Sequence, residues 1–185
     1  MADLSTTYLG LKLRNPIIAS SSGLTNSVDN ILKMEECNVG AVVLKSIFEE
    51  QIRYESDQFI KSDDKSMATI NKGYEDVLQS RAYDFADAMQ YLSNFAKEHT
   101  LKEYLGFVSS VKKVVKIPVI ASVNCGSVYD WTSFAKRIQD AGADALELNI
   151  YILPADVNKT SADYEGIYFN IIENVKKYVT IPVSF

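Results

Sequence analysis

The segment that decides the fold is IPVIASVNCGSVYDWTSFAKRIQDAGADALELNIY, residues 117–151. It contains two short and almost continuously apolar runs, 117–124 and 144–151, which is typical of strands buried on both faces of a sheet. Between them, residues 127–141 follow a helical pattern that stops at Gly142, a residue suited to a helix C-terminus. A strand, a helix and a strand at this spacing predict a parallel βαβ unit.

The same rhythm continues along the chain in both directions. Further apolar runs begin at Pro16, Gly40 and Ile181, and further helical patterns cover residues 27–37, 100–115 and 163–179. The phrase V-x-I-P-V occurs at 115–119 and again at 179–183, each time between a helix and a strand. The sequence therefore predicts an α/β fold of the (β/α)₈ TIM-barrel family, with five strands and four helices present as a partial barrel.

Residues 47–99 interrupt this rhythm. They are polar at first and then rich in Tyr and Phe, and residues 84–97 carry a helical pattern. A connection of this length is usually functional or a small subdomain. We therefore expect residues 1–185 to form the N-terminal portion of a barrel with a long helical insertion at 47–99, because a complete barrel needs about 250 residues.

Composition excludes several classes of function. The 185 residues include 19 Lys and Arg against 24 Asp and Glu, a net charge of −5 that disfavours a nucleic-acid-binding face. His99 is the one histidine, and HExxH and CxxC motifs are absent, so no metal site is expected. No apolar run approaches the roughly 20 residues of a membrane span, and no signal segment is visible. We expect a cytoplasmic protein without a membrane partner.

Polar or small residues follow the first three predicted strands. Ser21, Ser22 and Gly23 follow the first strand, where small side chains permit the close approach of a flat ligand or simply form a turn. Lys45 ends the second strand, where it either faces a cofactor or phosphate or pairs with Glu49, Glu50 or Glu147. Asn124 ends the third strand. In barrels, active sites lie at these carboxyl ends of the strands.

The fourth predicted strand carries three polar side chains at alternate positions. Alternation places Glu147, Asn149 and Tyr151 on one face of the strand. Polar groups that face a barrel axis need hydrogen-bond partners. This pattern favours a ligand site at the end of the strand over a purely structural role.

Three ordered motifs resemble the dihydroorotate dehydrogenase family. They are Y-L-G-L-K-L-R-N-P-I-I-A-S-S-S-G at 8–23, G-A-V-V-L-K-S at 40–46 and A-G-A-D-A-L-E-L-N at 141–149. The resemblance implies a (β/α)₈ barrel that holds FMN at its C-terminal mouth. It also implies oxidation of a dihydropyrimidine, with hydride transfer to flavin N5.

The resemblance also implies roles for individual residues. Cofactor-binding positions match Ser21, Ser22, Gly23, Lys45, Ser46, Asn124 and Asn149, and substrate-facing positions match Lys45, Asn149 and Tyr151. Ile152 stands where the soluble class of the family has its catalytic cysteine, and it cannot accept a proton. The catalytic residues are therefore not assigned.

Two other functions fit the same residues. One is a phosphate-binding aldolase or isomerase barrel without flavin, in which Lys45 acts as an amine nucleophile. The other is a non-catalytic half-barrel fragment, because flavin phosphate sites usually follow the seventh and eighth strands of a barrel. Such a fragment should bind FMN poorly. It should also form a homo-oligomer, because its sheet has open edges.

Overall fold

The computed structural model describes residues 2–48, 85–125 and 128–185. Residues 1–48 and 105–185 form one compact unit, and residues 49–104 form a second one. The first unit contains the sheet and every candidate site residue. The described part of the second unit is helical, and most of the predicted insertion, residues 49–84, lies outside the described residues.

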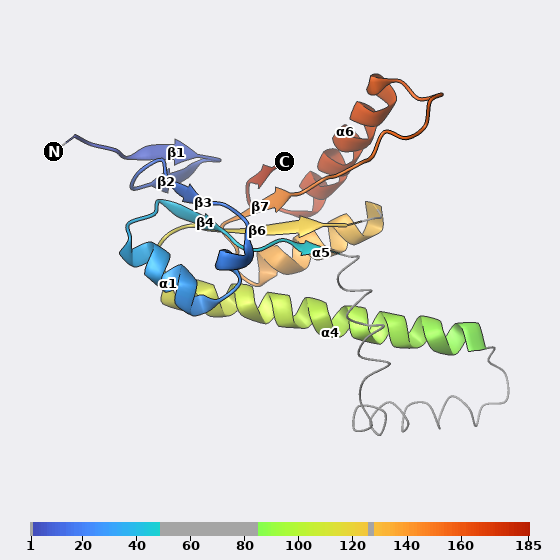
Figure 1. Ribbon diagram of the computed structural model, residues 1–185, viewed down its shortest axis with the longest axis horizontal. Coiled ribbons are helices and arrows are strands. Elements are labelled where there is room, and N and C mark those ends of the chain that lie inside the picture. Colours follow the sequence, from blue (N-terminus) through green and yellow to red (C-terminus); the bar gives the residue numbers. More distant parts are fainter. Residues whose placement is uncertain (1, 49–84, 126–127) are drawn as a thin grey trace. The chain divides into compact units, whose positions relative to one another are not determined.

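A parallel sheet forms the centre of the first unit (Figure 1). Its strands run in chain order: β3 (Ile18–Ala19), β4 (Ala41–Val43), β6 (Val119–Asn124), β7 (Ala145–Leu148) and β8 (Val183–Ser184). Every neighbouring pair is parallel. Sequential order is that of a singly wound barrel, whereas a doubly wound sheet reverses its order at a switch point. The predicted α/β class with a five-strand partial barrel is confirmed.

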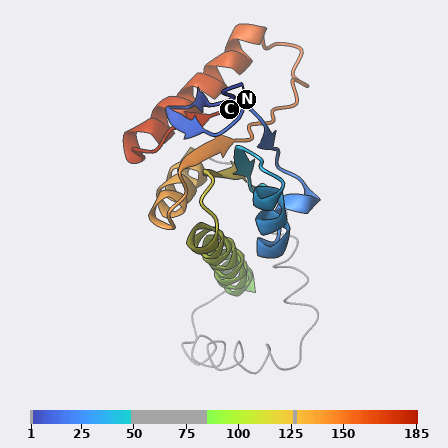
Figure 2. The ribbon, with the colours of Figure 1, turned by 90° about the vertical axis from the view of Figure 1, so that its left-hand side faces the viewer.

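The described residues contain four α-helices: α1 (Val28–Glu36), α4 (Phe85–Val114), α5 (Val128–Asp140) and α6 (Ser161–Tyr178). Within the first unit, α1, the end of α4, α5 and α6 follow one another around the outside of the sheet (Figure 2). The prediction of separate helices at 84–97 and 100–115 was wrong. Residues 85–105 contain no Gly or Pro, so the helix continues through Thr100 instead of beginning there.

Capping residues define the ends of the other helices. The Ser27 hydroxyl accepts a hydrogen bond from the N–H of Asn30 at the start of α1. Thr160 and Asp163 form a reciprocal capping box at the start of α6. Gly142 follows α5 with φ +99°, so its predicted role as a C-terminal cap is confirmed.

An antiparallel hairpin that was not predicted precedes the sheet. It pairs β1 (Thr6–Tyr8) with β2 (Leu11–Leu13) through a Leu9–Gly10 turn in which both residues have positive φ, as a type I′ turn requires. Leu9 and Leu11 pack against a cluster formed by Val43, Ile120 and Ala145 on the sheet. The hairpin therefore covers apolar side chains near the amino ends of the strands.

The two faces of the sheet differ in chemistry. Ile120, Ser122 and Asn124 share one face of β6, and the parallel register places Ala145 and Glu147 beside them on β7. The opposite face is wholly apolar and buried, and it packs against helices such as α5; its members include Val119, Ala121, Val123, Leu146 and Leu148. The face that carries Ile120, Ser122 and Asn124 is called the inner face below. It alone carries polar side chains toward the carboxyl ends of β6 and β7.

One extra residue lies in the second strand. Val43 is aligned with Ile120 and Ile47 with Val123, so four steps along one strand oppose three along the other. The chain resumes as β5 (Ile47–Phe48), which also pairs with β6. Such an extra residue acts like a β-bulge, which re-aims neighbouring side chains. Here it brings Ser46 toward Ser122 on the inner face.

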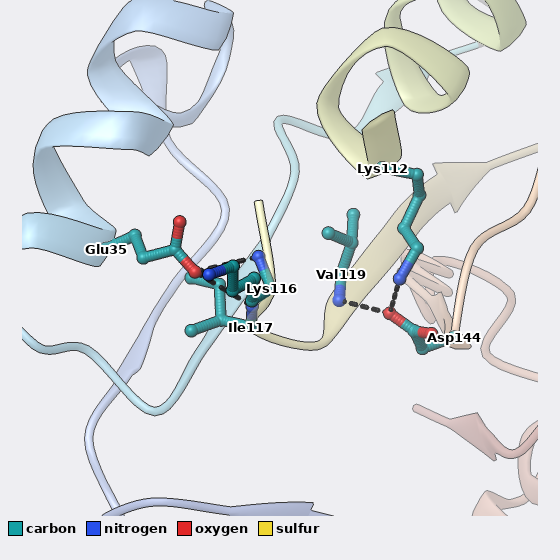
Figure 3. A network of polar contacts seen from close by, with 6 residues as sticks. All are labelled: Glu35, Lys112, Lys116, Ile117, Val119 and Asp144. Atoms are coloured by element: carbon teal, nitrogen blue, oxygen red, sulfur yellow. Dashed lines mark hydrogen bonds and ion pairs between the residues drawn. The ribbon is translucent and has the colours of Figure 1, made fainter. Parts of the chain in front are cut away.

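Side chains also bind the backbone that leads into the strands (Figure 3). Asp144 Oδ2 accepts hydrogen bonds from Lys112 Nζ at 2.6 Å and from the N–H of Val119 at 2.7 Å. Glu35 Oε1 accepts from the N–H groups of Lys116 and Ile117. These contacts lie at the amino ends of the strands, the face on which barrels concentrate stability rather than catalysis.

Candidate functional site

A chain of polar side chains crosses four neighbouring strand ends. Ser21 Oγ lies 3.1 Å from Ser46 Oγ and also accepts the Ser46 N–H at 2.9 Å. Ser46 Oγ lies 2.6 Å from Ser122 Oγ, which donates to Glu147 Oε1 at 2.8 Å. Residues far apart in the sequence therefore meet in one continuous hydrogen-bonded row.

Much of this row is buried. Ser122 is fully buried, Ser46 is 5% exposed and Glu147 is partly buried. Barrel interiors are usually filled by branched aliphatic side chains, and polar groups are costly there unless they are hydrogen-bonded. Among the described residues, no buried side-chain nitrogen or oxygen lacks a partner. The buried groups of the polar row are thus all hydrogen-bonded. The row lies nearer the carboxyl ends of the strands than the apolar cluster that the hairpin covers.

Both predicted asparagines join this network. Asn149 Nδ2 lies 3.5 Å from Ser46 Oγ, and the Asn149 N–H donates to the carbonyl of Val123 at 2.9 Å. Asn124 Nδ2 donates to the carbonyl oxygen of Asn149 at 2.5 Å. Asn149 is exposed and Asn124 half-buried, so these two residues form the solvent-facing edge of the polar row.

Lys45 lies between the second strand and its continuation. Its N–H donates to the carbonyl of Thr25 at 3.1 Å, and the residue is half-buried. Within the described ranges, no hydrogen bond or ion pair engages its ammonium group. Glu147 is bonded to Ser122, and the other predicted partners, Glu49 and Glu50, lie outside the described residues. The ammonium is therefore a candidate to bind an anionic or electron-rich group.

Of the small residues after the first strand, Ser22 is engaged in a helix cap, whereas Gly23 borders open space. Ser22 caps the short 3₁₀ helix η1 (Gly23–Thr25): its hydroxyl accepts from the N–H of Leu24, and its own N–H donates to Thr25 Oγ1. A Cβ atom on Gly23 would meet nothing within 4 Å. Packing within the described chain therefore does not require glycine at 23, which is consistent with space left for a ligand.

Tyr151 is not part of the polar row. β7 ends at Leu148, so the strand alternation that predicted its orientation does not extend to Tyr151, which is 75% exposed. Conversely, Ser122 was overlooked, although a serine inside an otherwise apolar strand was a usable signal.

Among the described residues, no three His, Cys, Asp or Glu side chains could hold a metal ion, and no described helix has the length and apolarity of a membrane span.

Comparison with known proteins tests the predicted resemblance. No family model matches the chain. Over 151 residues it is 28% identical to the catalytic subunit of dihydroorotate dehydrogenase B (NAD(+)) from Thermoplasma acidophilum, a match that covers 81% of this chain. It is also 28% identical over 151 residues to the PreA subunit of NAD-dependent dihydropyrimidine dehydrogenase from Escherichia coli K12, covering 80%. The resemblance to the dihydroorotate dehydrogenase-like family is confirmed.

The chain spans less than half of the length of these two relatives. The matches cover 42% of the Thermoplasma protein and 32% of PreA. Among solved structures, an IMP dehydrogenase/GMP reductase-like protein from Corynebacterium glutamicum matches with a TM-score of 0.44 and 18% identity, covering 98% of this chain and 42% of that one. Both sequence relatives are named as dehydrogenase subunits.

Proposed function

We propose that the chain is part of a cytoplasmic, FMN-dependent oxidoreductase that acts on a dihydropyrimidine-like ring. The observation that carries this proposal is the similarity over 151 residues to two enzymes named for dihydroorotate and dihydropyrimidine oxidation. The polar row at the strand ends supplies hydrogen-bonding groups where a barrel holds its ligand.

The residues present suit the ring of a flavin. Lys45 supplies a cation without a partner in the described chain, Gly23 leaves open space, and the two asparagines supply amide groups. A bound flavin would supply the hydride acceptor. Lys45 would hold negative charge near that ring, and Asn149 would orient the substrate. Ile152 cannot act as a base, so the proton acceptor must be another residue.

Flavin titration tests the proposal. The full chain should quench the fluorescence of FMN saturably, and it should bind lumiflavin, which lacks the phosphate, about as tightly, because the contacts named above are all to the ring. Lys45→Met should weaken binding on the order of tenfold, the loss of about one charge-assisted hydrogen bond. Lys33→Met, an equivalent change on the exposed side of α1, should leave affinity unchanged. No saturable binding, or equal losses in both variants, would contradict the proposal.

We also propose that copies of the chain associate. Among the described residues, β3 and β8 each pair with a neighbour on one side only, and unpaired strand edges favour pairing with another chain. Ile17, beside β3, is 62% exposed. Light scattering after size exclusion should report more than one copy, and Ile17→Lys should shift the protein toward monomer. A monomer at all concentrations would argue against association.

A further inference from the structure

The hydrogen bonds between Glu147 and Asn149 have one consistent direction. A carboxylate only accepts, so Ser122 is the donor in its hydrogen bond with Glu147. The 2.6 Å contact between the two serine oxygens then requires Ser46 to donate to Ser122. With its proton used, Ser46 Oγ can only accept, and its two lone pairs face Ser21 Oγ and Asn149 Nδ2.

This direction settles how the Asn149 amide is turned. Its NH₂ group must face Ser46, because Ser46 has no proton left to give to an amide oxygen. The Oδ1 atom of Asn149 is therefore the end left for other partners at the exposed edge. The hydrogen bonds that connect Glu147 to Asn149 run through the two buried hydroxyls of Ser122 and Ser46.

We propose that Glu147 is a positioning residue: its charge sets the proton order through Ser122 and Ser46, and so holds Asn149 with its carbonyl oxygen toward the ligand. The ligand in this statement rests on the proposed function, whereas the proton order does not. A buried hydroxyl chain polarised from one end behaves as a unit, so its two ends should be energetically coupled.

Asn149→Asp tests the coupling, because it places an acceptor at both ends. Ser122 still donates to Glu147, and Ser46 now donates to the new carboxylate at position 149. The 2.6 Å contact between the two serine oxygens is then left without a proton, which is repulsive. Adding Glu147→Gln removes the conflict, since the amide introduced at position 147 can rotate and donate to Ser122. Ser122 can then donate to Ser46, and the whole chain reverses.

The experiment is a double-mutant cycle on thermal unfolding of the full chain, without flavin. E147Q alone should leave the midpoint unchanged or lower it slightly, and N149D alone should lower it. E147Q added to N149D should raise the midpoint, a reversal of sign that loss of packing does not produce. Ser46→Ala should abolish the coupling because it removes the connecting hydroxyl. Glu165→Gln, the same change on an exposed part of α6, should not raise the midpoint of N149D.

Additive effects at 147 and 149, or coupling that survives Ser46→Ala, would overturn the proposal. If N149D does not fold, recovery of folded protein in the double variant is the predicted sign, and failure of both to fold contradicts it. Because the cycle contains no flavin, its outcome is independent of the titration above. A chain that shows the coupling and binds no flavin would retain this inference and lose the proposed function.

Discussion

Glu35 on α1 and Gln139 on α5 hold equivalent positions in the fold. Glu35 Oε1 accepts hydrogen bonds from the N–H groups of residues 116 and 117, at 2.8 and 3.1 Å. Gln139 Oε1 accepts from those of residues 180 and 181, at 2.6 and 3.2 Å. In both pairs the second residue is the isoleucine of an Ile-Pro-Val phrase that enters a strand. The repeated phrase in the sequence thus has a repeated acceptor, supplied each time by the helix that leads into the neighbouring strand of the sheet.

Removing the acceptor at Glu35 should destabilise the fold. Glu35→Ala leaves two N–H groups without their protein partner, one of them partly buried, which should cost about 1–2 kcal/mol of unfolding free energy. Glu35→Gln keeps an oxygen at the same place and should cost much less. Urea denaturation of the two variants measures the difference, and equal losses would show that charge, not the acceptor, matters.

Asp144 should contribute more than the lysine with which it pairs. Its Oδ2 atom accepts from Lys112 Nζ at 2.6 Å and from the N–H of fully buried Val119 at 2.7 Å. Lys112→Ala removes a partly exposed ion pair, worth about 0–1 kcal/mol. Asp144→Ala also leaves the Val119 N–H unpaired, at a cost of about 1–3 kcal/mol.

Chemical denaturation at low and high salt separates the two contributions of Asp144. The effect of Lys112→Ala should shrink with salt because the ion pair is screened, and the backbone contribution should persist. A Lys112→Ala loss as large as that of Asp144→Ala would contradict this division.

The parallel strands and the four helical regions could be predicted because each follows a local rule. Buried strands are continuous apolar runs, and helices have a periodic apolar face. Local rules failed at residues 84–115, where a capping pattern at Thr100 lies inside the continuous helix α4. They also missed the β1–β2 hairpin, whose Leu9–Gly10 turn depends on two residues with positive φ.

The site was harder to predict than the strands. Alternation correctly placed Glu147 and Asn149 toward the same polar row, where Glu147 bonds Ser122 and Asn149 bonds Ser46, because the backbone pairing with β6 continues as far as the Asn149 N–H. It could not show that Ser46 meets Ser122, since that contact depends on an extra residue in the second strand relative to β6. It also failed at Tyr151, which lies beyond the last residue of β7.

Gly40 should tolerate no side chain. A Cβ atom there would overlap the carbonyl oxygen of Asn15 and lie 3.1 Å from that of Ile17. Both atoms belong to the backbone and cannot turn aside, so Gly40→Ala should cost about 3 kcal/mol. Gly166→Ala, inside α6 with nothing within 4 Å of the added atom, should instead stabilise by up to about 1 kcal/mol. Thermal unfolding should give a lower midpoint for Gly40→Ala and a higher midpoint for Gly166→Ala than for the wild type. A Gly40→Ala variant as stable as the wild type would contradict the close approach of the Asn15 backbone to Gly40.

Asp163 should make the stability of α6 depend on acidity. The backbone N–H and then the hydroxyl of Thr160 donate to its carboxylate and hold the pKa of Asp163 below its ordinary value of 3.8. When the pKa of an acidic group is lower in the folded state than in the unfolded state, the group stabilises the protein at pH values above its unfolded-state pKa. This contribution is lost as the pH falls through the folded-state pKa. Asp163→Asn should therefore lower the unfolding midpoint at neutral pH and match the wild type in strong acid. Thermal unfolding from neutral to strongly acidic solution measures this convergence, and a gap that stays constant with pH would show that the carboxylate charge is not responsible.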